Sequence, residues 1–153
     1  MYRTIVVGTD GSKTATLAVA RAADLAACAG AKLVVVSAYR PAPGDEVTAQ
    51  RTQAPDDVAW AVTPDAAAQL VLDGAKEVAE RAGVGEVRTV AVDVAPEDAL
   101  LDVAERLHAD AIVVGSQGMA GARRFLLGSV PNRVAHHAVC DVLIVKTDAA
   151  LDG

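Results

Sequence analysis

Short runs of apolar, mostly β-branched residues alternate with longer helical stretches, and this alternation constrains the fold of the chain more than any other feature. The first run, with Ile5, Val6 and Val7, is continuously apolar, as in a strand covered on both faces. Strand–helix–strand units this short favour parallel strands joined by right-handed crossovers. We predict strands at 4–8, 32–39, 86–94, 109–115 and 141–146, and helices at 13–29, 64–82, 96–108 and 129–137.

These elements predict an α/β fold with one domain over residues 1–153: a three-layer α/β/α sandwich around a five-stranded, mostly parallel sheet. Gly30 and Gly83 close two of the helices, and Pro64 and Pro96 suit first helical turns. Residues 40–63 are rich in proline and polar residues and keep no period, so we predict a long, mobile surface loop there.

The charge balance narrows the classes of partner. Lys and Arg number 14 against 20 Asp and Glu, a net charge of −6, which argues against general binding to nucleic acid or anionic membranes. No apolar run approaches the roughly 20 residues that span a bilayer. The first residues lack the pattern of a signal peptide, so we expect a soluble cytoplasmic protein with reduced thiols. Cys28 is expected to be a small buried side chain of a packed helix.

The chemistry of such a sheet is expected at the carboxyl ends of its strands. The segment 115–129 lies at that edge and is rich in glycine: Gly115 and Gly118 follow a strand, and Gly128-Ser129 opens a helix. Glycines let backbone N–H groups approach an anion, and a helix N-terminus adds free N–H groups and a favourable dipole. Turn geometry alone would also explain the glycines, but the Gly-Ser pair at a helix start favours a phosphate site.

Two common phosphate motifs are missing. The chain has no Gly-x-x-x-x-Gly-Lys-Ser/Thr sequence of a P-loop. The turn after the first strand, 8–12, lacks the Gly-x-Gly-x-x-Gly pattern of a dinucleotide site. An NAD or FAD enzyme and a P-loop NTPase are therefore disfavoured.

The spacing Gly115-x2-Gly118-x9-Gly128-Ser129, together with Asp10 after the first strand, resembles the universal stress protein family, and more narrowly its ATP-binding branch in actinobacteria. The resemblance extends from the opening segment 5–12 to the closing segment 140–146. It implies strand order 3-2-1-4-5, an adenine nucleotide alpha hydrolase-like sandwich. It also implies ATP at the point where the strand order reverses, and a homodimer through the last strand, 141–146.

The resemblance also implies roles for individual residues. It implies phosphate contacts at Gly115, Gly118, Gly128, Ser129 and the backbone of Val130; a ribose or cation contact at Asp10; adenine contacts at Thr9 and Ala38; and sugar contacts at Val114 and Ser116. Asp10 has a plainer alternative as a turn former. Pro131 departs from the family pattern, which more often has a polar residue at this position. Proline lacks an N–H donor, although the first turn of a helix tolerates it.

The resulting hypothesis is a nucleotide-binding stress-response or signalling module that changes state on binding ATP, with or without Mg²⁺, and hydrolyses it slowly at most. No residue is assigned a catalytic or metal-ligating role, because no general base, acidic cluster or phosphate-loop lysine is identifiable. AMP or cyclic AMP is the alternative ligand. A nucleotidyl or phosphoryl transfer enzyme, and an interaction protein that binds no nucleotide, are the alternative functions.

Overall fold

The computed structural model describes residues 1–39, 64–116 and 129–147. The predicted loop 40–63 and the interior of the glycine-rich segment, with Gly118 and Gly128, lie outside the described residues.

The described elements follow the predicted order. They are β1 (Thr4–Gly8), α1 (Lys13–Ala29), β2 (Lys32–Ala38), α3 (Pro64–Arg81), β3 (Val87–Val92), α4 (Pro96–Arg106), β4 (Ala111–Gly115), α5 (Ser129–His137) and β5 (Asp141–Val145). The five strands form one sheet in the order β3-β2-β1-β4-β5, and every neighbouring pair is parallel. The α/β class, the five parallel strands and the order 3-2-1-4-5 are confirmed.

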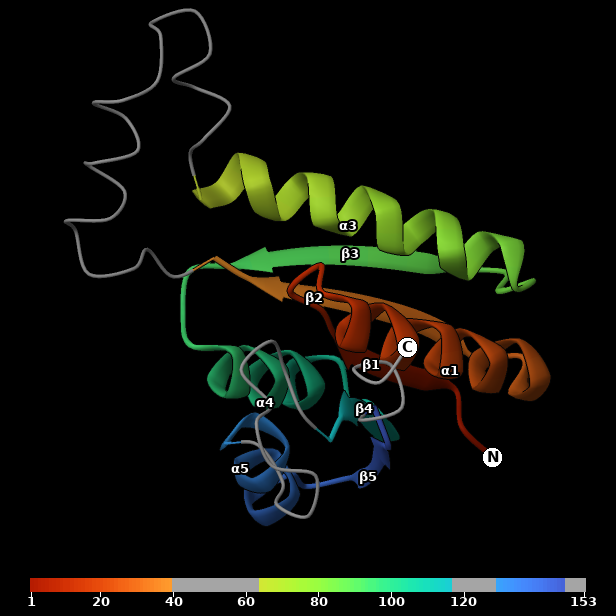
Figure 1. Cartoon of the computed structure of the whole chain (residues 1–153). Coiled ribbons are helices and arrows are strands. Elements are labelled where there is room, and N and C mark those ends of the chain that lie inside the picture. The colour runs from red at the N-terminus through yellow and green to blue at the C-terminus, as the bar shows by residue number, and fades with distance from the viewer. Residues whose placement is uncertain (40–63, 117–128, 148–153) are drawn as a thin grey trace, which may run out of the picture.

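Helices cover both faces of the sheet (Figure 1). On one face Ile5, Val7, Leu33 and Val35 pack with the buried residues of α1 and α3. On the other face, Val6, Val34, Val36, Ile112 and Val114 pack with those of α4 and with Val134 of α5. Burial on both faces explains why the middle parts of β1, β2 and β4 are continuously apolar in sequence.

The helix ends follow the local chemistry of the chain. Ser12 caps α1, its side chain accepting a hydrogen bond from the backbone N–H of Ala15 at 3.2 Å. Gly30 ends the same helix with φ = +68°, in the left-handed region that glycine tolerates. Pro96 occupies the first turn of α4, followed by Glu97 and Asp98 beside the positive end of the helix dipole.

The prediction for Cys28 is wrong, because this residue is exposed. The buried stripe of α1 runs through Ala18, Ala22 and Ala26. Cys28 lies two positions beyond Ala26, which is about 200° around the helix and therefore on the solvent side. No helix in the described ranges is long and apolar enough to cross a membrane.

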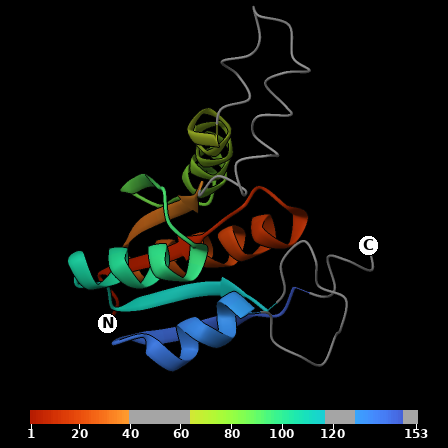
Figure 2. The ribbon, with the colours of Figure 1, turned by 90° about the vertical axis from the view of Figure 1, so that its left-hand side faces the viewer.

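The sheet order places a crevice at one edge. β1 pairs with β2 on one side and with β4 on the other, so the connections leaving β1 and β4 cover opposite faces. In Figure 1 the arrowheads of β2 and β3 lie at the left, and Figure 2 views the molecule from that side. Parallel sheets bind ligands in such a crevice, beyond the carboxyl ends of the strands.

Candidate functional site

A pocket lies at the carboxyl ends of β1 and β4. Its walls come from the end of β1 and the turn that follows it, from the ends of β2 and β4, and from the starts of α1, α4 and α5. The lining residues are Gly8, Thr9, Asp10, Ser12, Thr14, Ala15, Val36, Ala38, Pro96, Leu100, Val114, Gly115 and Val130.

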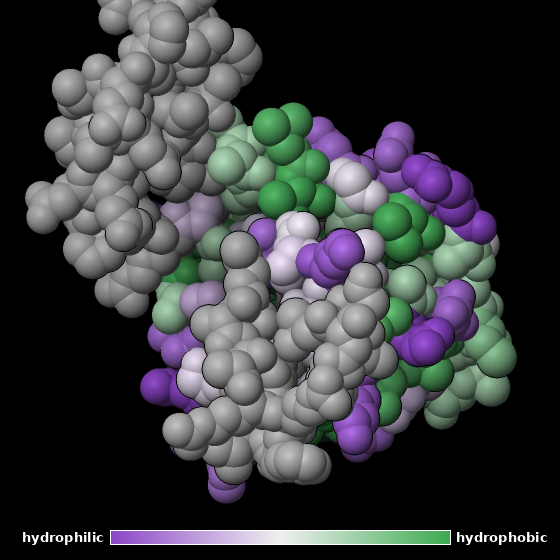
Figure 3. Space-filling model, in the orientation of Figure 1, coloured by the Kyte–Doolittle hydropathy of each residue, from purple (hydrophilic) through white to green (hydrophobic). Residues whose placement is uncertain are grey.

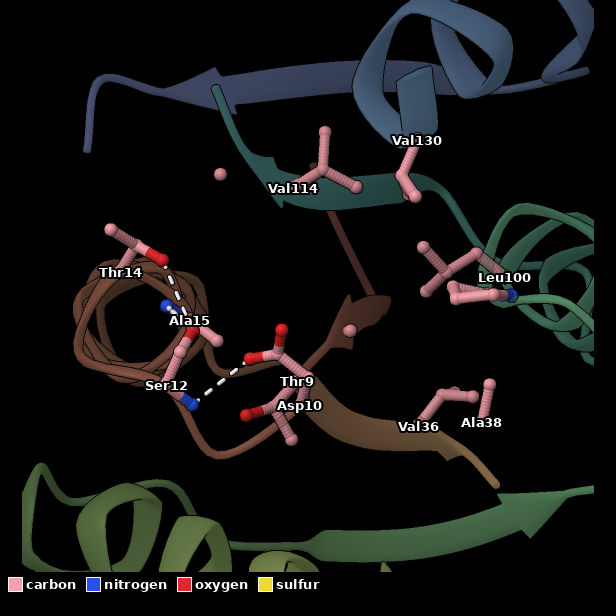
Figure 4. A pocket seen from close by; sticks show the side chains of 13 residues that line it. Thr9, Asp10, Ser12, Thr14, Ala15, Val36, Ala38, Leu100, Val114 and Val130 are labelled. Atoms are coloured by element: carbon pink, nitrogen blue, oxygen red, sulfur yellow. Dashed lines mark hydrogen bonds between the residues drawn. The ribbon is translucent and has the colours of Figure 1, made fainter. Parts of the chain in front are cut away.

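One side of the pocket is polar, and hydrogen bonds between residues close in sequence shape it (Figure 4). Oδ1 of Asp10 accepts a hydrogen bond from the N–H of Ser12 at 2.9 Å, and Oγ1 of Thr9 accepts one from the N–H of Gly11 at 3.1 Å. The hydroxyl groups of Ser12 and the buried Thr14 lie 3.1 Å apart. Asp10 therefore forms the turn, and its Oδ2 makes no hydrogen bond with the part of the chain that is described.

The other side of the pocket is apolar. Figure 4 shows Val36, Ala38, Leu100, Val114 and Val130 facing the polar turn across the pocket. Leu100 packs against Gly8 so closely that a Cβ on this glycine would lie 3.1 Å from a methyl carbon of Leu100. The pocket therefore offers an apolar wall and a polar wall to a ligand.

Three helices begin beside the pocket. Ser12, Thr14 and Ala15 belong to the start of α1, Pro96 is the first residue of α4, and Val130 is the second residue of α5. Helix N-termini carry a partial positive charge and unpaired N–H groups. Their convergence favours a ligand that carries negative charge, because these groups can bind its oxygens.

Six of the ten predicted site residues line this pocket: Thr9, Asp10, Ala38, Val114, Gly115 and Val130. Ser129 begins α5 with an exposed side chain and is not a lining residue. Ser116 follows Gly115 but is turned toward β5: its N–H donates to the carbonyl of Val145 at 2.7 Å, and its Oγ accepts from the N–H of Thr147 at 3.0 Å.

Sequence reasoning missed the other seven lining residues: Gly8, Ser12, Thr14, Ala15, Val36, Pro96 and Leu100. A signal existed for Val36, because strand alternation places it on the same face as Ala38. No such signal existed for Leu100, whose position depends on how α4 crosses the sheet.

Among the residues that the structure describes, the titratable groups with shifted pKa values lie at the opposite edge of the sheet. Asp110 precedes β4 and accepts hydrogen bonds from the N–H groups of Arg3 and Thr4 at 2.8 and 2.9 Å, which lowers its pKa. The Tyr2 hydroxyl donates to Asp141 at 2.9 Å, and this bond raises the tyrosine pKa. Burial raises the pKa of the Cys140 thiol. These groups join the N-terminus to β4 and β5, far from the pocket.

Within residues 1–39, 64–116 and 129–147, no group of three or more His, Cys, Asp or Glu side chains could hold a metal ion.

A second hollow lies between α1 and α3 and shares Thr9 with the pocket. Apolar surface is visible over α3 in the view of Figure 3. Leu70 of this helix is 69% exposed.

Comparison with known proteins gives a consistent result. The sequence profile of the universal stress protein family matches residues 1–146. The universal stress protein Rv1636 of Mycobacterium tuberculosis is 43% identical over 146 residues, which are 95% of this chain and 97% of that protein.

Two solved structures carry ligand information. A universal stress protein in complex with cAMP has a TM-score of 0.70 at 37% identity, covering 95% of this chain and 98% of that one. The universal stress protein of Archaeoglobus fulgidus in complex with dAMP has a TM-score of 0.67 at 26% identity, covering 95% of this chain and 98% of that one.

Proposed function

Because the chain belongs to the universal stress protein family, we propose that its pocket binds an adenine nucleotide and that the protein is a stress-response or signalling module of the cytoplasm. Binding shifts the protein between states, and hydrolysis is slow at most. The observation that carries the proposal is the pocket between β1 and β4, with its apolar wall facing a polar turn and three helix N-termini beside it.

The two sides of the pocket suggest how the nucleotide lies. The adenine rests against the apolar wall near Ala38, with Thr9 at its edge, and Val114 flanks the sugar. The Oδ2 atom of Asp10 accepts a hydrogen bond from the ribose or contacts a bound cation. Gly115, Gly118, Gly128, Ser129 and the backbone of Val130 bind the phosphates, which the nearby start of α5 favours electrostatically.

The identity of the nucleotide has two candidates. ATP, alone or with Mg²⁺, is the ligand implied by the resemblance of the glycine spacing from Gly115 to Ser129 to the ATP-binding branch of the family. AMP or cyclic AMP is the second candidate, and the structures of relatives in complex with cAMP and with dAMP support it.

The proposed module is a homodimer that pairs through β5. β5 is the last strand of the sheet, with β4 as its neighbour. Leu143, in the middle of this strand, is 43% exposed. An apolar edge strand of this kind is stabilised when a second copy pairs with it across a two-fold axis.

Isothermal titration with ATP, ADP, AMP and cyclic AMP, each with and without Mg²⁺, tests the proposal. In the Ala38→Phe variant an aromatic ring fills the apolar side of the pocket, so we expect binding to be lost. Ala67→Phe makes the same change at an exposed position on α3 and should bind as the wild type does. If none of the four nucleotides binds the folded wild type, the proposed function is wrong. A turnover of several ATP per second would instead establish an enzyme.

A further inference from the structure

Ser116 joins the pocket to the end of β5. The residue before it, Gly115, lines the pocket and pairs with Val145 in the sheet register. Ser116 itself donates its N–H to the carbonyl of Val145 at 2.7 Å. Its hydroxyl oxygen accepts the N–H of Thr147 at 3.0 Å and lies 3.3 Å from the Thr147 hydroxyl. Ser116 therefore makes one contact with the last residue of β5 and two with Thr147, which follows the strand.

These contacts form at a position where the edge strand becomes buried. Along β5, exposed and half-buried residues alternate until Val145, which packs into the core under α1. Thr147 is fully buried. A buried N–H that loses its acceptor costs more than an exposed one, because water cannot replace the partner. The Ser116 hydroxyl therefore holds the end of β5 in place.

We infer that Ser116 is a positioning residue that couples occupancy of the pocket to the order of the β5 end. The inference rests on the proposed nucleotide binding and adds its regulation. A ligand that contacts Gly115 restrains the backbone on one side of Ser116, and the hydrogen bonds to Val145 and Thr147 restrain it on the other. Ligand binding then reduces the opening of the β5 end, a coupling through dynamics that needs no change in mean structure.

This coupling has a reciprocal consequence. Any interaction that orders the β5 end must raise nucleotide affinity by the same factor by which the nucleotide favours that interaction. Pairing of β5 with a second copy is such an interaction. Nucleotide affinity is then expected to rise with protein concentration across the range where copies associate.

Amide hydrogen exchange, followed by NMR with saturating cyclic AMP or ATP–Mg²⁺, tests the coupling. In the wild type we expect the ligand to slow exchange at Val145 and Thr147. Ser116→Ala removes the acceptor, so the Thr147 amide should exchange about fivefold faster without ligand, as for the loss of a hydrogen bond worth about 1 kcal/mol. In this variant the ligand should no longer change exchange at the Thr147 amide, and it should bind several-fold more weakly.

Three variants sharpen the test. Ser116→Thr keeps the hydroxyl and should restore both the protection and the ligand response. Ser116→Cys, with its weaker acceptor, replaces the alanine variant if that protein does not fold, and should give an intermediate response. Thr89→Val alters a half-buried hydroxyl on β3, at the opposite edge of the sheet, and should leave exchange at Thr147 unchanged.

The outcomes separate the coupling from the function on which it rests. Nucleotide binding without slowed exchange at the β5 end would overturn the coupling and leave the proposed function standing. The same holds if Ser116→Ala keeps the full ligand response. A folded wild type that binds no nucleotide would overturn both.

Discussion

Gly11 and Val71 are in direct contact, and the contact leaves no room for a side chain on the glycine. A Cβ built on Gly11 would lie 2.9 Å from Cγ2 of Val71, and the backbone φ of Gly11 is +83°. The turn that presents Thr9, Asp10 and Ser12 to the pocket therefore rests against α3. Both the conformation and the size of residue 11 shape the polar side of the site.

Gly11→Ala should lower the free energy of unfolding by about 1–3 kcal/mol. Alanine is strained in the left-handed backbone conformation, and its Cβ clashes with Val71, whose β-branched side chain cannot easily rotate about χ1. Urea denaturation measures this loss. In the double variant with Val71→Ala the steric part should be relieved, so the combined loss should be smaller than the sum of the two single losses. Strict additivity would show that the contact with Val71 is unimportant.

Asp10→Asn separates the two roles considered for Asp10. The amide oxygen can still accept the N–H of Ser12, so the turn and the stability should be kept, while the negative charge is lost. If the carboxylate contacts the ligand, titration should show affinity lower by about tenfold, the value expected for a hydrogen bond to a charged group. Unchanged affinity in Asp10→Asn would identify Asp10 as a turn former alone.

Leu100→Ala should destabilise the protein by about 2–5 kcal/mol, because this side chain is only 3% exposed and its removal leaves a cavity beside Gly8. Since Leu100 also lines the pocket, nucleotide affinity should fall as well. Leu100→Met, which nearly conserves volume, is the control and should lose less than about 1.5 kcal/mol. Thermal unfolding and titration measure the two effects. Wild-type affinity in a folded alanine variant would remove Leu100 from the binding wall.

Asp110 should make stability depend on pH in acid. Its pKa is lowered in the folded state by the N–H groups of Arg3 and Thr4, so its contribution is complete above the usual carboxyl pKa of about 4. The contribution is lost as pH falls below that value toward the folded-state pKa.

Replacement by Asn removes this pH-dependent contribution but keeps an acceptor. At neutral pH Asp110→Asn should be less stable than the wild type by about 1 kcal/mol. Urea titrations between about pH 6 and about pH 2 should show the difference shrinking as acid is added. Parallel curves for the two proteins would contradict the role assigned to Asp110.

Leu143→Lys should weaken the proposed homodimer by at least about tenfold, because a charge on an apolar edge strand opposes pairing. The side chain is already 43% exposed in the single chain, so the fold should tolerate the change. Leu70→Lys, at a leucine on α3 that is 69% exposed, is the matched control and should not alter association. Analytical ultracentrifugation distinguishes the outcomes. A folded Leu143→Lys variant that associates as the wild type does would exclude β5 as the interface.

The sequence determined where the helices and strands lie and which strands are apolar throughout, because the signals for these properties are local. Burial of β1, β2 and β4 on both faces required continuous apolar runs such as Ile5–Val7, and Ser12, Gly30 and Pro96 marked helix ends through their own backbone chemistry. The strand order came from the resemblance to a family. Thr9, Asp10, Ala38 and Gly115 could be placed near the site because each lies at or directly after the carboxyl end of a strand.

The tertiary structure alone decided which distant residues meet. Leu100 reaches the pocket because α4 packs over the face that carries Val36 and Val114, and Val71 presses on Gly11 because α3 lies beside α1. Ser116 meets Thr147 across 31 positions of sequence because β4 and β5 pair in one register. Such contacts depend on how whole elements pack and align, a property of the assembled core that no local pattern of residues encodes.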